Sequence, residues 1–233
     1  MTPARAVALV VAVCATVACS GGDDDASPIA IFGDSLTYSA AGYLDAASQD
    51  ADVSVHVRGA PGAALCDLRG DAEALLQSRE LSAIVLVFAG NQFTDCIGGL
   101  DGDALADAYA TDARALADLA RERDVPVVLA GPPDMERSPW RENATRLNER
   151  MREIAEDLDG VDYLDLRETL SPDGFTLTLE CEAGETEAQG CTDGSIRVRD
   201  EDGVHFDEPG PDGYSSGARR FGQALFEAGR AVG

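Results

Sequence analysis

Ser35 directly follows a short apolar run of strand length, Ile29 to Phe32, which stops at Gly33-Asp34. The next residues carry apolar side chains at helical spacing, so the sequence predicts a serine where a strand gives way to a helix. A helix N-terminus offers unpaired backbone N–H groups and the positive end of the helix dipole. A serine there can attack an ester carbonyl while its own N–H binds the resulting oxyanion. The position equally suits a serine that only caps the helix.

A nucleophilic serine needs a base, and the sequence contains two histidines. His56 lies inside an expected strand, and we interpret it as a structural or surface residue. His205 lies in the stretch Asp202-Gly203-Val204-His205, after a loop and before the last expected helix. Asp202 is near enough in sequence to orient the imidazole through its Nδ1–H and to stabilise the imidazolium. The sequence therefore favours His205 as the base and Asp202 as its partner.

The elements that must position these residues alternate between short apolar runs and helical patterns. Expected strands cover residues 28–32, 53–58, 83–89, 125–130 and 161–166. Expected helices cover residues 36–48, 67–78, 103–122, 142–158 and 214–231. This order predicts an α/β fold, a three-layer α/β/α sandwich with a mostly parallel five-stranded sheet. Residues 171–202 are interpreted as a long polar connection.

Three polar or glycine positions follow the first three expected strands. Ser35, Gly62 and Asn91 each lie just past a strand end, and ligands of parallel sheets bind outside the carboxyl ends of the strands. A loop glycine or asparagine is usually only a turn residue. Their coincidence with a serine on one rim of the sheet favours a functional site there.

Four short motifs resemble the four sequence blocks of the SGNH (GDSL-type) hydrolases: Gly33-Asp34-Ser35-Leu36, Gly62, Gly90-Asn91 and Asp202-x-x-His205. The resemblance extends from about residue 28 to the end of the chain. It implies a flavodoxin-like sheet and a serine esterase in which Ser35 is the nucleophile. It also implies that His205 is the catalytic base and that Asp202 is its partner.

The same resemblance implies an oxyanion hole made by the backbone N–H of Ser35, the backbone N–H of Gly62 and the side-chain amide of Asn91. Gly59 is an alternative to Gly62, but the family spacing favours Gly62. Glycine is expected at 62 because the backbone must approach the substrate without a Cβ in the way. Gln92 stands where the family often has aspartate, a departure that affects the loop rather than the triad. The resemblance implies neither a metal nor an organic cofactor.

The first residues have the features of an export signal. Residues 1–18 begin with one cation and continue as an apolar run too short to span a bilayer. The run ends in small residues before Cys19, which resembles a bacterial lipoprotein signal with Cys19 as the lipidated residue; ordinary secretion is the alternative. Residues 19–27 are expected to be a flexible tether and residues 28–233 the hydrolase domain. We therefore expect an envelope-anchored or secreted protein.

Export places the remaining cysteines in an oxidising environment. Cys66, Cys96, Cys181 and Cys191 allow three pairings, of which we expect the nearest-neighbour one, Cys66 with Cys96 and Cys181 with Cys191. A metal site is disfavoured because the chain has no Cys-x-x-Cys spacing and no nearby histidine.

The charge of the chain excludes some partners and leaves several substrates open. The formal net charge of -25 argues against nucleic acid and against electrostatic attachment to anionic lipids. The leading hypothesis is an exported serine esterase that acts on carbohydrate O-acetyl, short acyl or lipid esters. The alternatives are an O-acyltransferase acting on envelope glycans and a non-catalytic glycan-binding lipoprotein. The sequence leaves the oligomeric state open.

Overall fold

The computed structural model describes residues 27–233, so the expected signal peptide, Cys19 and most of the expected tether lie outside the described residues. Five parallel strands form one sheet: β1 (Ile29–Gly33), β2 (Val55–Gly59), β3 (Ala83–Val87), β4 (Val127–Gly131) and β5 (Val161–Asp165). Their order across the sheet is β2-β1-β3-β4-β5. Because sheet strands in this arrangement all point the same way, their carboxyl ends meet at one edge.

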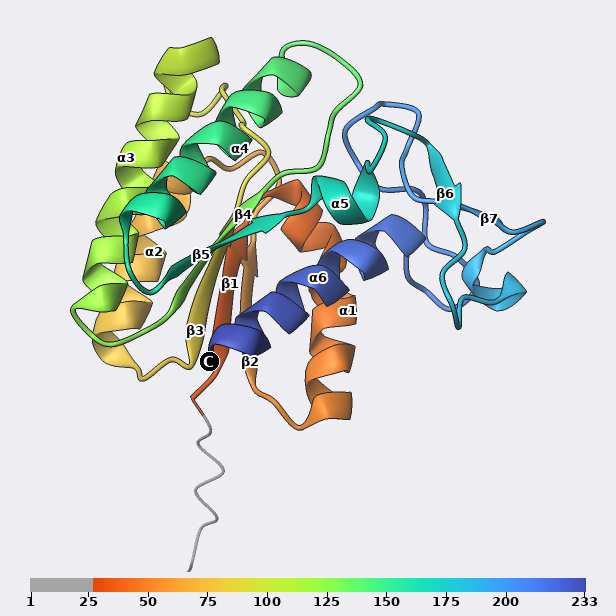
Figure 1. Cartoon of the computed structure of the whole chain (residues 1–233), viewed down its shortest axis with the longest axis horizontal. Coiled ribbons are helices and arrows are strands. Elements are labelled where there is room, and N and C mark those ends of the chain that lie inside the picture. The colour runs from red at the N-terminus through yellow and green to blue at the C-terminus, as the bar shows by residue number, and fades with distance from the viewer. Residues whose placement is uncertain (1–26) are drawn as a thin grey trace, which may run out of the picture.

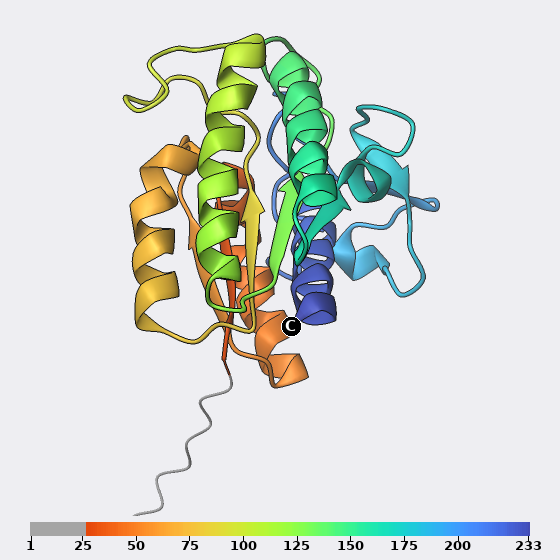
Figure 2. The same cartoon turned by 60° about the vertical axis from the view of Figure 1, so that its left-hand side comes forward.

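Within residues 27–233, six α-helices connect and cover the strands: α1 (Ser35–Ala51), α2 (Leu65–Ser78), α3 (Gly102–Arg121), α4 (Trp140–Asp157), α5 (Arg167–Leu170) and α6 (Ser216–Val232). Helices α2, α3 and α4 cover one face of the sheet, and α1, α5 and α6 cover the other (Figures 1 and 2). The expected three-layer α/β/α sandwich is confirmed, and the boundaries of the ten expected elements differ from the observed ones by at most three residues; the short helix α5 was not expected.

Side chains that alternate along the buried strands pack into two apolar cores, one on each face of the sheet. In β1, Ala30 and Phe32 pack with α2, α3 and α4, while Ile29 and Ile31 pack with α1 and α6. Every residue of β1, β3 and β4 is buried, which explains why these strands are continuous apolar runs in the sequence. The edge strand β2 is less buried, and its His56 is half-buried beside the Phe32 ring.

The segment 171–202 contains elements that the sequence does not predict. It forms a hairpin of β6 (Thr178–Glu180) and β7 (Ser195–Arg197), with a short 3-10 helix at Glu187–Gln189 between them. The hairpin lies beyond the start of α6 (Figure 1). Arg220 of α6 fixes it by donating to the Glu185 carboxylate and to the Glu180 carbonyl. The three-residue strands are too short and polar to give a periodic signal.

Two disulfides cross-link the described chain, with the expected nearest-neighbour pairing. Cys66 is joined to Cys96 with their Cα atoms 6.2 Å apart, and Cys181 is joined to Cys191 with theirs 5.9 Å apart. Asp67 lies close to the sulfurs of the first bond, but disulfide sulfurs are not the thiolates that metal ions prefer. In residues 27–233 no helix combines the length and apolar character needed to cross a membrane.

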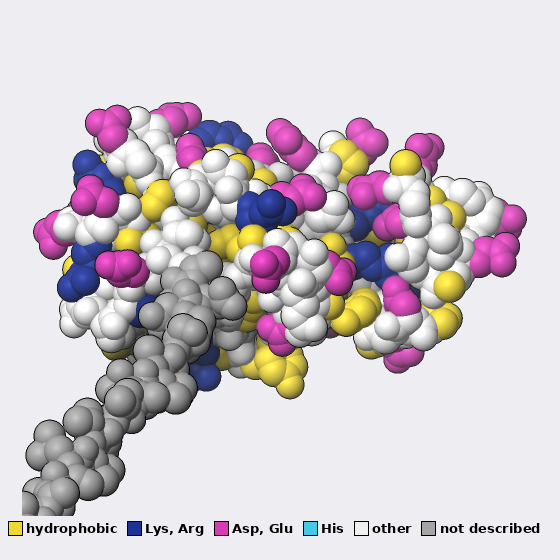
Figure 3. All heavy atoms as spheres, turned by 90° about the horizontal axis from the view of Figure 1, so that it is seen from below, with side chains coloured by type: hydrophobic (Ala, Val, Ile, Leu, Met, Phe, Trp, Pro, Cys, Tyr) yellow, Lys and Arg dark blue, Asp and Glu magenta, His cyan; other side chains and the backbone are white. Residues whose placement is uncertain are grey.

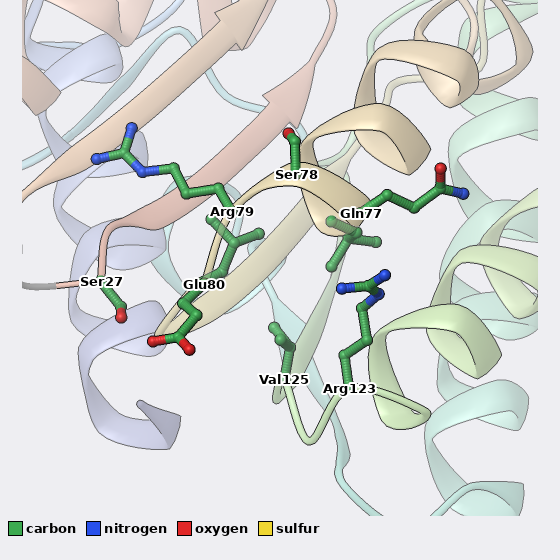
Figure 4. A pocket seen from close by; sticks show the side chains of 9 residues that line it. Ser27, Gln77, Ser78, Arg79, Glu80, Arg123 and Val125 are labelled. Atoms are coloured by element: carbon green, nitrogen blue, oxygen red, sulfur yellow. The ribbon is translucent and has the colours of Figure 1, made fainter.

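Both ends of the described chain lie at the amino edge of the sheet. The Pro28 carbonyl accepts a hydrogen bond from Ser82 N at 3.1 Å, and Gly233 packs against Ser82. Figure 1 places the C-terminus beside the start of the strands. A cavity of about 480 Å³ at this edge is lined by Arg79, Glu80, Arg123 and other residues shown in Figure 4. This cavity lies at the edge of the sheet opposite to the one that carries Ser35.

On the one face that Figure 3 shows, acidic side chains are spread rather than gathered in one patch. Figure 3 shows Asp and Glu side chains across the face seen from below, with fewer arginines between them. Exposed pairs such as Arg146–Asp103 at 2.6 Å join α4 to α3, and each contributes little to stability.

Candidate functional site

The turn that carries Ser35 is built around Asp34, which caps α1. Asp34 Oδ1 accepts a hydrogen bond from Leu36 N at 3.0 Å. Ser35 is therefore the first helical residue and its hydroxyl does not cap the helix. Ser35 Oγ lies instead 3.1 Å from His205 Nε2, 170 residues away in the sequence. The interpretation of Ser35 as a mere cap is wrong because its neighbour provides the cap.

Two glycines let the start of α1 approach the strands closely. A Cβ at Gly33 would lie 2.5 Å from the Val87 carbonyl oxygen of β3. A Cβ at Gly59, the last residue of β2, would lie 2.4 Å from the backbone nitrogen of Tyr38. Real side chains do not tolerate such contacts with backbone, so both positions require glycine. The first turn of α1, and Ser35 with it, is thereby seated on the ends of three strands.

His205 and Asp202 come from the loop between β7 and α6. His205 Nδ1 lies 2.6 Å from Asp202 Oδ2, and Asp202 Oδ1 accepts the backbone N–H groups of Val204 and His205 at 2.8 and 2.9 Å. Burial opposes ionisation of Asp202, but hydrogen bonds from the His205 ring and from these backbone groups outweigh it and lower the pKa of the carboxyl. An ionised carboxylate only accepts hydrogen bonds, so Nδ1 carries the proton and Nε2 faces the Ser35 hydroxyl as an acceptor.

Arg199, a residue that the sequence analysis missed, forms hydrogen bonds that fix the loop that carries His205. The Arg199 side chain is fully buried and donates to the Val204 carbonyl at 2.9 Å and to the Asp134 carbonyl at 2.6 Å. Glu136 N also donates to the Gly203 carbonyl at 2.9 Å. These contacts fix the middle of the Asp202–His205 turn, at Gly203 and Val204, against the segment after β4.

Asp34 is the most deeply buried carboxyl group near the site. Besides Leu36 N, it accepts Ala89 N at 2.6 Å and Asn91 Nδ2 at 3.3 Å, both through Oδ2. It thus joins the start of α1 to the chain just after β3. Desolvation by burial raises the pKa of Asp34 to about 6, even though the backbone donors of Ala89 and Leu36 favour the ionised form. The sequence analysis treated Asp34 only as part of a motif.

This raised pKa predicts a pH dependence of stability. Stability gained from the Asp34 proton is fully present below the unfolded-state pKa near 3.8 and is lost as the pH rises through about 6. Relative to Asp34→Asn, the wild-type free energy of unfolding should fall by about 2 kcal/mol between pH 4 and pH 7. Urea denaturation of both proteins at several pH values measures the difference. The exposed Asp45→Asn variant controls for the loss of one charge, and a pH-independent difference for Asp34→Asn would contradict the prediction.

Two loops at the carboxyl edge carry the other predicted site residues: the Gly62 loop (residues 60–64) and the Asn91 loop (residues 88–101). Gly62 has φ +75°, and a Cβ there would meet nothing within 4 Å. The backbone conformation is thus one reason for glycine at this position, and the expected close approach of the backbone to the substrate stays a prediction. In residues 27–233, the backbone N–H groups of Ser35 and Gly62 have no hydrogen-bond acceptor.

Asn91 is already engaged in this structure. Its Nδ2 donates to the Ala63 carbonyl at 2.9 Å and, more weakly, to Asp34 Oδ2 at 3.3 Å, which uses both amide hydrogens. The Asn91 carbonyl accepts the buried Tyr109 hydroxyl at 2.9 Å. Asn143 of α4 donates to the Gly90 carbonyl and to Gln92 Oε1, so Gln92 has a structural partner. Tyr109 and Asn143 fix the base of the Asn91 loop, and neither was a predicted site residue.

The structure thus brings together most of the predicted site residues. Ser35, His205 and Asp202 form a continuous chain of contacts, and Asn91 reaches the same turn through Asp34. About half of the His205 and Asp202 side chains is exposed, at 47% and 46%, so the hydroxyl and imidazole are open to solvent. The arrangement provides a polarised hydroxyl beside unpaired N–H donors at a helix N-terminus.

Solved structures share this fold at low sequence identity. A lipase/acylhydrolase from Enterococcus faecalis is 17% identical, with 87% of this chain and 95% of that chain covered and a TM-score of 0.57. An acetyl-xylooligosaccharide esterase from Geobacillus Stearmophilus is 14% identical, with 89% and 94% covered and a TM-score of 0.59. A GDSL-like lipase from Bacteroides thetaiotaomicron is 12% identical, with 88% and 87% covered and a TM-score of 0.56. The fold is that of the SGNH (GDSL-type) hydrolases.

The family follows from the sequence itself. The chain belongs to the family described as "Protein of unknown function (DUF459)", whose model matches residues 28–216. A comparison with curated proteins gives no match.

Proposed function

We propose that this protein is a serine esterase that transfers an acyl group from an ester to water through Ser35. The observation that carries the proposal is the contact chain from Ser35 Oγ to His205 Nε2, at 3.1 Å, and from His205 Nδ1 to Asp202 Oδ2, at 2.6 Å. A nucleophile, a base and a group that orients the base are the three parts that acyl transfer through serine requires. The fold shared with the solved esterases and acylhydrolases agrees with this function.

In the first half-reaction the Ser35 oxygen bonds to the ester carbonyl carbon while its proton moves to His205 Nε2. The carbonyl becomes an oxyanion, and the imidazolium is stabilised by Asp202. When the intermediate collapses, the bond to the alcohol oxygen breaks and His205 returns the proton to the departing alcohol. Water then repeats the same steps on the acyl-Ser35 ester, which releases the acid and restores the hydroxyl.

The backbone N–H groups of Ser35 and Gly62 are the proposed first donors to the oxyanion. Neither has an acceptor within the described residues, so both are available without rearrangement. Asn91 can supply a third donor once its amide releases Asp34, since the 3.3 Å bond to Asp34 is the weaker of its two. The Asn91 amide would then donate a hydrogen bond to the substrate oxygen only as negative charge develops on that oxygen. Such a bond stabilises the transition state more than the bound substrate.

Export is part of the proposal, and the two disulfides agree with it. Lipid attachment at Cys19 remains a proposal for the anchored form. Carbohydrate O-acetyl, short acyl and lipid esters remain the candidate substrates.

A fluorophosphonate probe tests the proposal directly, because it reacts with activated serines. The wild-type protein should be labelled once, at Ser35, and the matched variant Ser39→Ala, one turn further along α1, should be labelled equally. It should also hydrolyse members of a panel of p-nitrophenyl esters and acetylated glycans. Absence of both labelling and turnover would exclude an esterase and favour a binding protein. Transfer to a glycan hydroxyl at a higher rate than to water would instead identify an acyltransferase.

A further inference from the structure

The Cys66–Cys96 disulfide joins the two loops that carry the proposed second and third oxyanion donors. Cys66 lies in the first turn of α2, four residues after Gly62, and Cys96 lies in the Asn91 loop, five residues after Asn91. The bond therefore crosses from one donor loop to the other. The second disulfide, Cys181–Cys191, closes a ten-residue span within the hairpin segment and joins none of the proposed site residues.

Apart from apolar packing in a shared core cluster, few interactions join these loops. Among residues 27–233, one hydrogen bond joins the Gly62 loop to the Asn91 loop, from Asn91 Nδ2 to the Ala63 carbonyl. It is made by the same amide that is proposed to turn toward the oxyanion. When Asn91 releases Asp34 during the reaction, this hydrogen bond and the Cys66–Cys96 disulfide remain as the connections between the two loops besides apolar packing.

The Asn91 loop is fixed on its other side. Tyr109 and Asn143 hold its base against α3 and α4, and Ile97 is buried in the core. The rest of the loop has no regular secondary structure and contains three glycines with positive φ, Gly90, Gly98 and Gly99. Loss of the disulfide would therefore leave the base of the Asn91 loop in place, while the distance between the rest of the loop and α2 would no longer be fixed. The expected effect falls on the position of the donors rather than on folding.

The bond is also accessible to solvent. Cys96 is exposed and Cys66 is partly exposed, so a small thiol reagent can reach the sulfurs. A dithiol that reduces the bond passes two electrons and two protons to it. The S–S bond breaks, Cys66 and Cys96 become thiols, and the dithiol becomes a cyclic disulfide. Both loops then keep only the Asn91–Ala63 hydrogen bond.

We propose that the Cys66–Cys96 disulfide makes ester hydrolysis at Ser35 conditional on an oxidising environment, because the bond keeps the Gly62 and Asn91 donors in register. This inference rests on the proposed function. Its physical basis is that an oxyanion donor displaced by about 1 Å loses much of its catalytic effect. The oxidised protein is the active form, and reduction switches it to a folded form of low activity.

Cysteine-to-alanine variants of the two disulfides provide a matched comparison. Cys66→Ala/Cys96→Ala should lower kcat for p-nitrophenyl acetate by about 10- to 100-fold, with KM nearly unchanged, because the donors act mainly on the transition state. Cys181→Ala/Cys191→Ala should keep kcat within about twofold of wild type, since only distant loop geometry changes. A purely structural role for both bonds predicts lower Tm in both variants with no such separation in kcat.

Reduction of folded protein covers the case in which the first variant does not fold. In the Cys181→Ala/Cys191→Ala variant, Cys66–Cys96 is the disulfide that remains within residues 27–233, so dithiothreitol reduces this bond there. Activity should fall by the same factor while circular dichroism stays native, and reoxidation should restore it. Unchanged activity after complete reduction, or a loss that follows global unfolding, would overturn the inference while the proposed function stands. If the oxidised wild type neither turns over esters nor binds the fluorophosphonate, the proposed function fails and this inference fails with it.

Discussion

Replacement of Ser35 by alanine is expected to abolish ester hydrolysis in a protein that remains folded. The Oγ atom forms the acyl bond, so its loss should lower kcat/KM by about 10⁴-fold or more. The fold should tolerate the change because Asp34, not Ser35, caps α1, and alanine has a high intrinsic helix propensity. Steady-state assays with p-nitrophenyl acetate, together with thermal denaturation, measure both effects.

The matched control for this experiment is Ser39→Ala. Ser39 lies one turn further along α1, and its hydroxyl donates to the Ser35 carbonyl at 2.9 Å. Its removal deletes a hydroxyl from the same helix face without touching His205, so turnover should stay near that of the wild type. Equal turnover by Ser35→Ala and wild type would show that another group is the nucleophile.

Asp202→Asn is expected to have the second largest effect, a fall in kcat of roughly 10²–10⁴-fold. The structure gives the reason. Oδ1 accepts the N–H groups of Val204 and His205, so an asparagine keeps its oxygen there and turns its NH₂ toward the imidazole. Nδ1 must then accept a hydrogen bond, and the ring proton moves to Nε2. That tautomer cannot take the proton of Ser35.

Glu201→Gln tests whether any lost negative charge near His205 has this effect. Glu201 is the residue before Asp202, and its side chain is 79% exposed. Its carboxylate pairs with Arg197, and the hydrogen bonds of the His205 ring go to Asp202 and Ser35, so kcat should change by less than about twofold, as for most surface substitutions. Comparable losses in the two variants would assign the effect to the local electric field and not to the orientation of the ring.

The sequence was sufficient for the layers of the fold because the central strands are buried on both faces. Continuous apolar runs such as residues 83–87 have few other interpretations between two helical patterns. The prediction that Ser35, His205 and Asp202 lie close together depended on the resemblance to the SGNH hydrolases and on the shared edge of parallel strands. The structure brings these three side chains into contact, while their catalytic roles remain predictions.

The supporting residues could not be predicted because local patterns point elsewhere. Arg199 follows Ile196 and Val198 in an alternating stretch, so the pattern places its side chain outward, yet tertiary contacts with two carbonyl groups bury it. The Asn143 amide and the Tyr109 hydroxyl lie on helices far along the chain, and their carbonyl partners carry no side-chain signal. The engaged state of the Asn91 amide depends on distances that no motif encodes.

The positions of the two ends of the described chain have a practical consequence. Pro28 and Gly233 both pack beside Ser82 at the amino edge of the sheet, whereas Ser35 starts the helix at the opposite edge. A five-residue strand separates these edges by about 17 Å. A surface, tag or fusion partner joined at either end would therefore face away from the hydroxyl. Immobilised preparations can be coupled through both ends while bulky esters still reach the open side of the domain.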